Sequence, residues 1–109
     1  MAVLTADDSN FEQLLKENNS VIVKYYADWC GTCKLFSPKF KRLSGDERFE
    51  GIAFLDVNAE VNPLSRKSAS VNNLPSFAIY KYGKHLETVS TGKEELVVEL
   101  LDKLKVGAN

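Results

Sequence analysis

The segment that most constrains the fold is an apolar run at residues 21–27, with the sequence VIVKYYA. The run is rich in β-branched and aromatic residues and is too short for a helix, so it predicts a β-strand. Its side chains are apolar on both faces except at Lys24, which is typical of a strand in the middle of a sheet. We therefore expect other elements to cover both faces of the sheet that contains it.

The hydrophobic pattern of the remaining chain alternates helices with strands. Two capping-box patterns, S-x-x-E at residues 9–12 and T-x-x-E at residues 91–94, mark helix starts, and Pro63 suits the first position of a helix. The pattern predicts helices at residues 9–18, at about residues 31–47, from Asn62-Pro63 and after Thr91, and strands at residues 52–57, 77–80 and 86–89. Val3-Leu4 is expected to form a short first strand.

This order of elements predicts an α/β fold. Strand–helix–strand units imply parallel pairing with right-handed crossovers, and a turn at residues 82–84 adds an antiparallel hairpin. We expect one domain over residues 1–109, with a central mixed sheet flanked by four helices. The chain's two cysteines follow the central strand directly, at its C-terminal end, where open α/β sheets place their reactive sites.

Charge and hydropathy exclude several classes of function. The chain has 14 basic and 15 acidic residues, which gives a net charge of −1. This balance argues against a general binder of nucleic acid or of anionic membranes. The first ten residues, MAVLTADDSN, lack the pattern of a signal peptide, and no apolar run is long enough to span a bilayer. We therefore expect a cytoplasmic protein.

The only two cysteines, Cys30 and Cys33, have C-x-x-C spacing and allow three kinds of site. A structural zinc ion needs four ligands, and the one histidine, His85, is expected to be an exposed turn residue. We expect no metal, although a site shared between two chains stays open. A lasting structural disulfide is unusual in the cytosol. The third possibility is a pair that cycles between dithiol and disulfide.

The surrounding residues favour this redox reading. Cys30 lies at the predicted strand-to-helix junction, where the free N–H groups of the first turn and the helix dipole stabilise a thiolate. Gly31 is expected to let the chain turn tightly into the helix, and Cys33 follows one turn later, within reach of a mixed disulfide at Cys30. Trp29 is either a core aromatic or an exposed contact for a partner.

The sequence resembles the thioredoxin family over essentially its full length. The resemblance rests on ADWCGTCK at residues 27–34, NLPSF at residues 73–77 and YKYGK at residues 80–84. It implies the thioredoxin fold, with Cys30 as an exposed nucleophile and Cys33 as a buried resolving thiol that form a disulfide when oxidised. It also implies a cis Leu74–Pro75 bond facing this disulfide, with the backbone of Leu74 pairing with substrate.

The same resemblance implies a protein-disulfide reductase. Its substrates would be disulfide-containing proteins, and its electrons would come from an NADPH-dependent flavoprotein reductase, with no cofactor bound to the chain itself. We expect a monomer that binds neither nucleic acid nor membrane. Two alternatives remain: a binding or scaffold subunit of the same fold without electron transfer, and a more oxidising, isomerase-like variant.

The chain departs from the family pattern at its active-site dipeptide and in its substrate groove. In this family the dipeptide between the cysteines tunes the redox potential; here it is Gly31-Thr32, in which Thr32 replaces the family's common proline. Because threonine keeps a backbone N–H, we expect a somewhat less reducing couple. In the groove, Thr91 or Gly92 occupies the position where the family usually has a glycine.

The largest departure is Lys24, which matches the position of the family's buried acid. Phe54 matches the position of that acid's usual lysine partner, so the sequence predicts that the charge pair is missing. Two interpretations of Lys24 follow. It is a buried group that transfers a proton or tunes the potential, or it extends along its stem to solvent and is only a surface residue.

Overall fold

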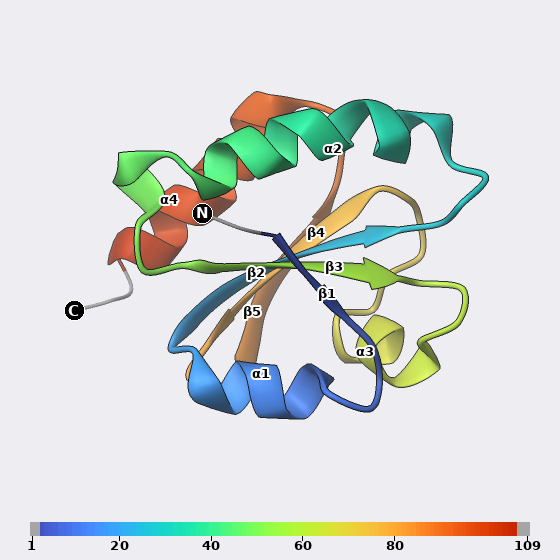
Figure 1. The fold of residues 1–109 in the computed structure, drawn as a ribbon, viewed down its shortest axis with the longest axis horizontal. Coiled ribbons are helices and arrows are strands. Elements are labelled where there is room, and N and C mark those ends of the chain that lie inside the picture. Colours follow the sequence, from blue (N-terminus) through green and yellow to red (C-terminus); the bar gives the residue numbers. More distant parts are fainter. Residues whose placement is uncertain (1–2, 107–109) are drawn as a thin grey trace.

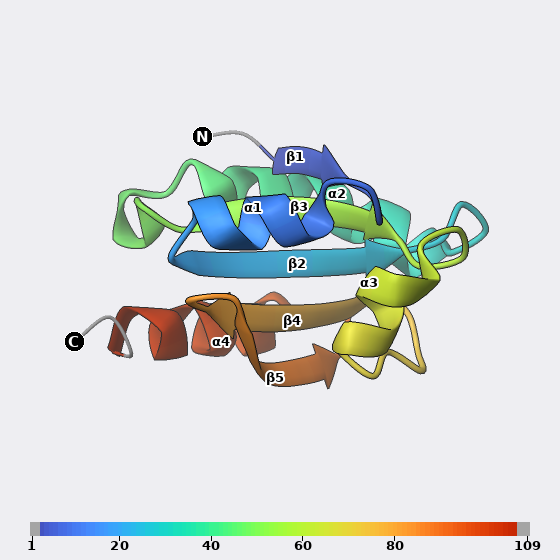
Figure 2. The same ribbon diagram turned by 90° about the horizontal axis from the view of Figure 1, so that it is seen from below.

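Residues 3–106 are described by a computed structural model, in which two pairs of helices enclose a five-stranded sheet (Figure 1). Helices α2 and α4 cover one face of the sheet, and α1 and α3 lie on the other (Figures 1 and 2). The predicted α/β class is confirmed. In chain order the elements are β1 (Val3–Ala6), α1 (Phe11–Glu17), β2 (Ser20–Tyr26), α2 (Gly31–Ser44), the 3₁₀ helix η1 (Glu47–Phe49), β3 (Ala53–Asn58), α3 (Pro63–Ser68), β4 (Ser76–Lys81), β5 (Lys84–Ser90) and α4 (Glu94–Val106).

The apolar run at residues 21–27 forms the central strand, as predicted. The strand order is β1-β3-β2-β4-β5, with β2 parallel to β3 and antiparallel to β4 (Figure 2). Strand β1 pairs in parallel with β3 at one edge, and the predicted β4–β5 hairpin forms the other. Its two turn residues, Tyr82 and Gly83, have φ values of 52° and 80°, as two-residue hairpin turns require.

Alternate side chains of β2 enter two separate apolar cores. Val21, Val23 and Tyr25 pack with α1 residues on one face of the sheet. Ile22 packs on the other face with side chains of α2 and α4, such as Phe40. Both faces of β2 are covered, so the side chain of Lys24 is buried as well. A buried charged group needs polar partners inside the protein.

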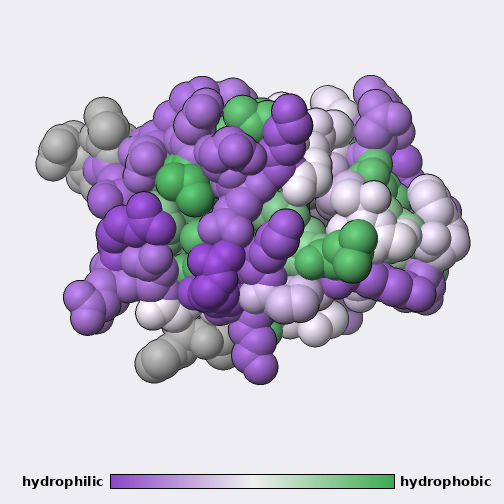
Figure 3. Space-filling view, turned by 90° about the horizontal axis from the view of Figure 1, so that it is seen from above, coloured by the Kyte–Doolittle hydropathy of each residue, from purple (hydrophilic) through white to green (hydrophobic). Residues whose placement is uncertain are grey.

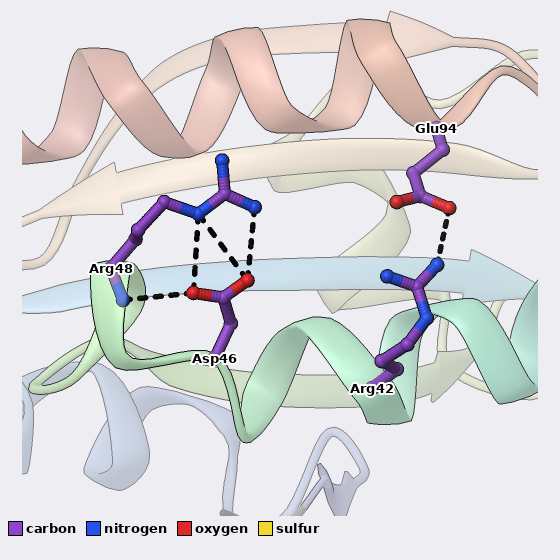
Figure 4. A network of polar contacts seen from close by, with 4 residues as sticks. All are labelled: Arg42, Asp46, Arg48 and Glu94. Carbon is purple, nitrogen blue, oxygen red and sulfur yellow. Dashed lines mark hydrogen bonds and ion pairs between the residues drawn. The ribbon is translucent and has the colours of Figure 1, made fainter.

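The outer surface of α2 and α4 is largely hydrophilic, with small apolar patches (Figure 3). Arg42 of α2 donates a hydrogen bond of 2.5 Å to Glu94 of α4, and Asp46 accepts from both the backbone and the guanidinium of Arg48 (Figure 4). The bonds from Arg48 hold the pKa of Asp46 below its usual value. Exposed ion pairs of this kind contribute little to the free energy of unfolding. The buried faces of α2 and α4 therefore hold these two helices on the sheet. Within residues 3–106, no helix combines the length and the apolar character needed to cross a membrane.

Two details of the helices differ from the sequence prediction. Ser9 does not cap α1: the carboxylate of Asp7 accepts hydrogen bonds from the backbone of Ser9 and Asn10, and thereby closes the turn before the helix. The second helix ends at Ser44 rather than near residue 47, because Asp46 starts a separate turn of 3₁₀ helix. Pro63 is the first residue of α3, as predicted.

A buried hydroxyl cluster connects the sheet to α3. The hydroxyl of Tyr25 donates to the carbonyl of Ser65 at 2.9 Å and lies 3.0 Å from the hydroxyl of Tyr80. The Tyr80 hydroxyl is also 2.6 Å from Oγ of Ser68. Burial raises the pKa of both phenols, so they remain protonated hydrogen-bonding groups at neutral pH.

Replacing Tyr25 with phenylalanine should lower the free energy of unfolding by about 1–2 kcal/mol, because two buried oxygen atoms lose a partner. Denaturation in urea measures the change. The matched control is Tyr82→Phe, because Tyr82 is 65% exposed and should change stability by no more than about 0.5 kcal/mol. Equal effects of the two substitutions would contradict a structural role for the hydroxyl cluster.

Candidate functional site

The two cysteines lie where β2 passes into α2. The backbone N–H of Cys30 donates to the carbonyl of Ala27 at 3.1 Å, which closes the turn between strand and helix. Cys30 is the N-cap residue of α2, and Cys33 lies in its first turn. The two residues form a disulfide, with their Cα atoms 5.3 Å apart. The predicted position at the carboxyl end of the central strand is confirmed.

The first turn of α2 directs a hydrogen-bond donor at one of the two sulfur atoms. The backbone N–H of Cys33 donates to Sγ of Cys30 at 3.1 Å. The same N–H and the positive end of the helix dipole would stabilise a thiolate at Cys30 once the disulfide is reduced. Because the donor comes from the helix backbone, this bond depends on where α2 begins and not on a side chain.

The two cysteines differ less in their solvent exposure than expected. Cys30 is 5% exposed and Cys33 is 2% exposed, so the expectation of an exposed Cys30 is wrong for the disulfide form. The reason is local packing, since Tyr26 and Leu74 lie against the cysteine pair. What distinguishes Cys30 is therefore its place at the helix N-terminus.

Trp29, immediately before the pair, is 67% exposed. Its reading as a core aromatic is wrong, and the exposed position is the one that a contact with a partner requires. Val61 and Leu35 are also large apolar side chains on the surface, 70% and 74% exposed. Val61 belongs to the loop after β3. This loop lies next to the end of β2, because the backbone N–H of Ala59 donates to the carbonyl of Tyr26 at 2.8 Å.

A groove of about 360 Å³ lies beside the cysteine pair. The predicted cis Leu74–Pro75 bond is present in its wall. The N–H of Thr91 donates to the carbonyl of Pro75 at 3.2 Å and joins the two sides of the groove. The residues that line it are Thr32, Asn73, Leu74, Pro75, Ser90, Thr91 and Gly92.

Of the two candidates for the groove glycine position, Gly92 lies against the active-site dipeptide. A Cβ atom added to Gly92 would lie only 2.9 Å from Cγ2 of Thr32, so a side chain there requires Thr32 to move. Gly31 is different. An added Cβ would meet no atom within 4 Å, and its φ is not in the left-handed region, so the expected need for glycine at this turn is not supported.

Lys24 does not reach solvent, and its charge has a partner. The residue is 2% exposed, which contradicts the surface interpretation. Its Nζ donates to Oγ of Ser37 at 2.6 Å and lies 3.4 Å from Oδ1 of Asp56. The prediction of a missing charge pair, based on Phe54, is therefore wrong. In the sheet register Phe54 lies opposite Ile22, whereas Asp56 lies directly opposite Lys24.

The charge pair lies against the middle of α2, in mostly apolar surroundings. Nζ of Lys24 is 5.8 Å from the centre of the Tyr26 ring and 5.6 Å from that of Phe40. Burial raises the pKa of Asp56 above its usual value, although the Lys24 ammonium acts in the opposite direction. Burial and the nearby carboxylates of Asp56 and Asp28 raise the pKa of Tyr26, so its phenol stays protonated.

Sequence reasoning missed Asp56, Ser37 and Tyr26. An aspartate in the middle of an apolar strand was the available signal for Asp56, because strands are depleted in this residue. Nothing in the pattern of α2 marked Ser37, whose hydroxyl also donates to the carbonyl of Cys33 at 3.2 Å.

Metal-ligating side chains are not grouped around the cysteines. Within residues 3–106, no three histidine, cysteine, aspartate or glutamate residues are placed to hold an ion together. His85 is exposed, as expected, but lies in β5 rather than in the turn, where it contacts the Tyr80 ring and Oγ1 of Thr88.

Known proteins share both the sequence pattern and the fold. A family model described as Thioredoxin matches residues 2–103. Thioredoxin-T of Drosophila melanogaster is 32% identical over 101 residues, which are 93% of this chain and 64% of that protein. Thioredoxin of Staphylococcus haemolyticus is 30% identical over 105 residues, covering 94% of this chain and 98% of that one.

A solved structure agrees with these relatives. In a crystal structure of ferredoxin:thioredoxin reductase with thioredoxin f2, a chain superposes with a TM-score of 0.85 at 26% identity, covering 94% of each chain. With the family model spanning nearly all of the sequence, and with Cys30 and Cys33 joined at the start of α2, the chain belongs to the thioredoxin family of thiol–disulfide oxidoreductases.

Proposed function

We propose that this oxidoreductase reduces disulfides of other proteins, with Cys30 as the nucleophile and Cys33 as the resolving thiol. The observation that carries the assignment is the 3.1 Å hydrogen bond from the Cys33 N–H to Sγ of Cys30. It favours a thiolate at Cys30, and the thiolate is the species that attacks a disulfide. Both cysteines are almost fully buried in the disulfide form, so the roles are assigned from this hydrogen bond and not from exposure.

The reaction moves two electrons in two exchange steps. The Cys30 thiolate attacks one sulfur of the substrate disulfide, which forms a mixed disulfide and releases the other substrate sulfur as a thiolate that takes up a proton. Cys33 then loses its proton and attacks Sγ of Cys30. The Cys30–Cys33 bond forms, the mixed disulfide breaks, and the second substrate sulfur leaves. The substrate is reduced and the cysteine pair is oxidised.

Substrate recognition is assigned to the surface around the pair. The exposed indole of Trp29 offers an apolar contact beside the disulfide, and the groove along Leu74, Pro75 and Gly92 suits an extended peptide segment. In this binding mode the backbone of Leu74 pairs with the substrate strand, as β-strand addition generally does. Thr91 lines the same groove.

A separate reductase is proposed to return the pair to the dithiol. An NADPH-dependent flavoprotein is the donor that the family resemblance suggests, and no cofactor is assigned to the chain itself. A chain of similar fold occurs in a complex with ferredoxin:thioredoxin reductase, so a reductase of that class is a second candidate donor. We further propose that the protein is a cytoplasmic monomer. Its net charge of −1 argues against binding to nucleic acid or to anionic membranes. The scaffold and isomerase-like alternatives are not favoured, because the cysteine pair is intact and near full-length relatives are thioredoxins.

A variant with Cys33 replaced by serine should trap the mixed disulfide, because Cys30 still attacks substrate but nothing resolves the product. Mass spectrometry after mixing with insulin should find a stable adduct at Cys30. The matched control is Cys30→Ser, which should form no adduct. An adduct of the control at Cys33 would reverse the assigned roles.

The close approach of Gly92 to Thr32 predicts that a substitution at Gly92 impairs substrate binding and that a second substitution at Thr32 restores it. Gly92→Ala should displace Thr32 and narrow the groove, raising KM for a protein disulfide several-fold while changing turnover of a small disulfide little. Adding Thr32→Ser removes the clashing methyl group and should restore KM. Gly45→Ala is the control, because its added Cβ meets only a carbonyl oxygen at 3.8 Å. Failure of the double variant to recover would show that the contact does not shape the groove.

A further inference from the structure

The charged side chains on the outer face of α2 are all positive. The helix contains four basic residues and no acidic residue, whereas the whole chain has a net charge of −1. We use the name basic face for the exposed side chains that follow Cys33 along this helix: Lys34, Leu35, Pro38, Lys39, Lys41 and Arg42. The basic face therefore begins next to the cysteine pair and follows α2, the long helix at the top of Figure 1.

Most of these positive charges have no counter-charge in the protein itself. Arg42 is paired with Glu94 of α4 (Figure 4). Within residues 3–106, none of the three lysines of the basic face forms an ion pair. Lys93 brings a further exposed cation to the start of α2, because it follows Gly92, the residue that lies against Thr32.

The charge pattern of α2 differs from the one that a helix dipole favours. Helix α4 has the favoured pattern, with glutamates in its first turn and lysines in its last turn. Helix α2 has Lys34 close to its N-terminus, where the dipole disfavours a cation, and it has no acidic side chain that could form an i, i+4 pair. A surface that departs from local preference in this way is a candidate for a function.

We propose that the basic face of α2 binds an acidic segment of the substrate protein, with Leu35 as the contact for an apolar side chain of that segment. The occupant is argued from charge, because carboxylates of a partner would supply the counter-charges that the lysines lack within this chain. Leu35 is 74% exposed and lies one turn before Lys39, so an apolar contact lies beside a charged one. The inference rests on the proposed function and names acidic proteins as its preferred substrates.

The position of the lysines along the helix determines what they can affect. Lys39 and Lys41 lie about 9 and 12 Å from Cys33 along the helix axis, a distance that an extended peptide spans with about three or four residues. They are thus too far away to take part in the exchange between sulfur atoms. Their effect is on the association of the substrate, which attraction between opposite charges accelerates at low ionic strength and which salt screens.

Synthetic peptides with charged tails test the proposal on the wild-type protein. Each peptide has the same disulfide-closed loop, a short spacer and a tail of glutamates with one leucine, of serines, or of lysines with one leucine. The spacer keeps the tail from changing the reactivity of the sulfurs. Reduced protein is mixed with each peptide, so no reductase is needed, and the appearance of reduced peptide gives the second-order rate constant.

At low ionic strength the glutamate peptide should react about three- to tenfold faster than the serine peptide, and the lysine peptide should react more slowly than both. At high ionic strength the three rate constants should converge, because salt screens the attraction. Equal rate constants at low ionic strength would overturn the proposal.

A charge-reversed variant shows whether the basic face is responsible. Lys39→Glu combined with Lys41→Glu should reverse the order, so that the lysine peptide becomes the fastest. A misfolded variant could lose rate with every peptide but could not gain rate with the lysine peptide. An unchanged order would contradict the proposal.

The matched control is Lys16→Glu combined with Lys84→Glu, which changes the net charge by the same amount. Both residues are exposed, and they lie in α1 and at the β4–β5 turn, at the end of the sheet where β2 begins. This variant should keep the wild-type order of the peptides. A reversal in the control would show that net charge and not the basic face selects the substrate, and would contradict the proposal.

The apolar contact has its own test. Leu35→Ser should lower the rate constant of the glutamate peptide by a larger factor than that of the same peptide with its leucine replaced by serine. Equal factors would remove Leu35 from the proposed contact. Binding of short single-stranded DNA to the wild-type protein, lost in the variant with both Lys39→Glu and Lys41→Glu, would assign the basic face to nucleic acid and would contradict the proposal.

Failure of the proposed function would give a different result. If the reduced protein reduced none of the peptides at either ionic strength, the chain would not be a protein-disulfide reductase. If it reduced all of them at equal rates, the proposed function would stand and the preference for acidic substrates would be wrong.

Discussion

Complete burial of β2 is the constraint on which the rest of the structure depends. The strand pairs on both edges and is covered on both faces, so its carboxyl end must emerge at one edge of the sandwich. The chain turns there and starts α2 with Cys30 as the N-cap. The nucleophile, its backbone donor and the adjacent Trp29 are thus placed by the buried strand that precedes them.

The same burial explains the charge pair between β2, β3 and α2. A lysine in the middle of β2 has no route to water, so its position is acceptable only with a carboxylate and a hydroxyl as partners. Asp56 supplies the first and Ser37 the second. Asp56 is the member of the pair with more access to solvent, because its side chain is 26% exposed and that of Lys24 is 2% exposed.

Much of this arrangement could be predicted from local sequence. The apolar run, the helical spacing and the hairpin turn specified the elements and their order, because periodicity and turn chemistry act over a few residues. The C-x-x-C pair after a strand specified the sulfur at the helix start. The cis bond before Pro75 came only from the family resemblance, since nothing local distinguishes it.

What could not be predicted depends on residues far apart in the chain. Asp56 meets Lys24 only once strand order and register are known, and Asp8 caps α3 by accepting from the backbone of Leu64 and Ser65, more than fifty positions away. The low exposure of Cys30 arises from packing against Leu74, which also belongs to a distant segment. Local patterns carry no information about such contacts.

The central claim is that Cys30 and Cys33 form one reversible redox couple. The most direct test is a titration of the protein through buffers of defined glutathione potential. The fluorescence of Trp29, next to the pair, would serve as the readout. A single two-electron transition, with a tenfold change in the ratio of oxidised to reduced protein for about 30 mV, is the predicted result. It should be absent from Cys30→Ser. A pair that stays oxidised until the protein unfolds would be a structural disulfide and would contradict the assignment.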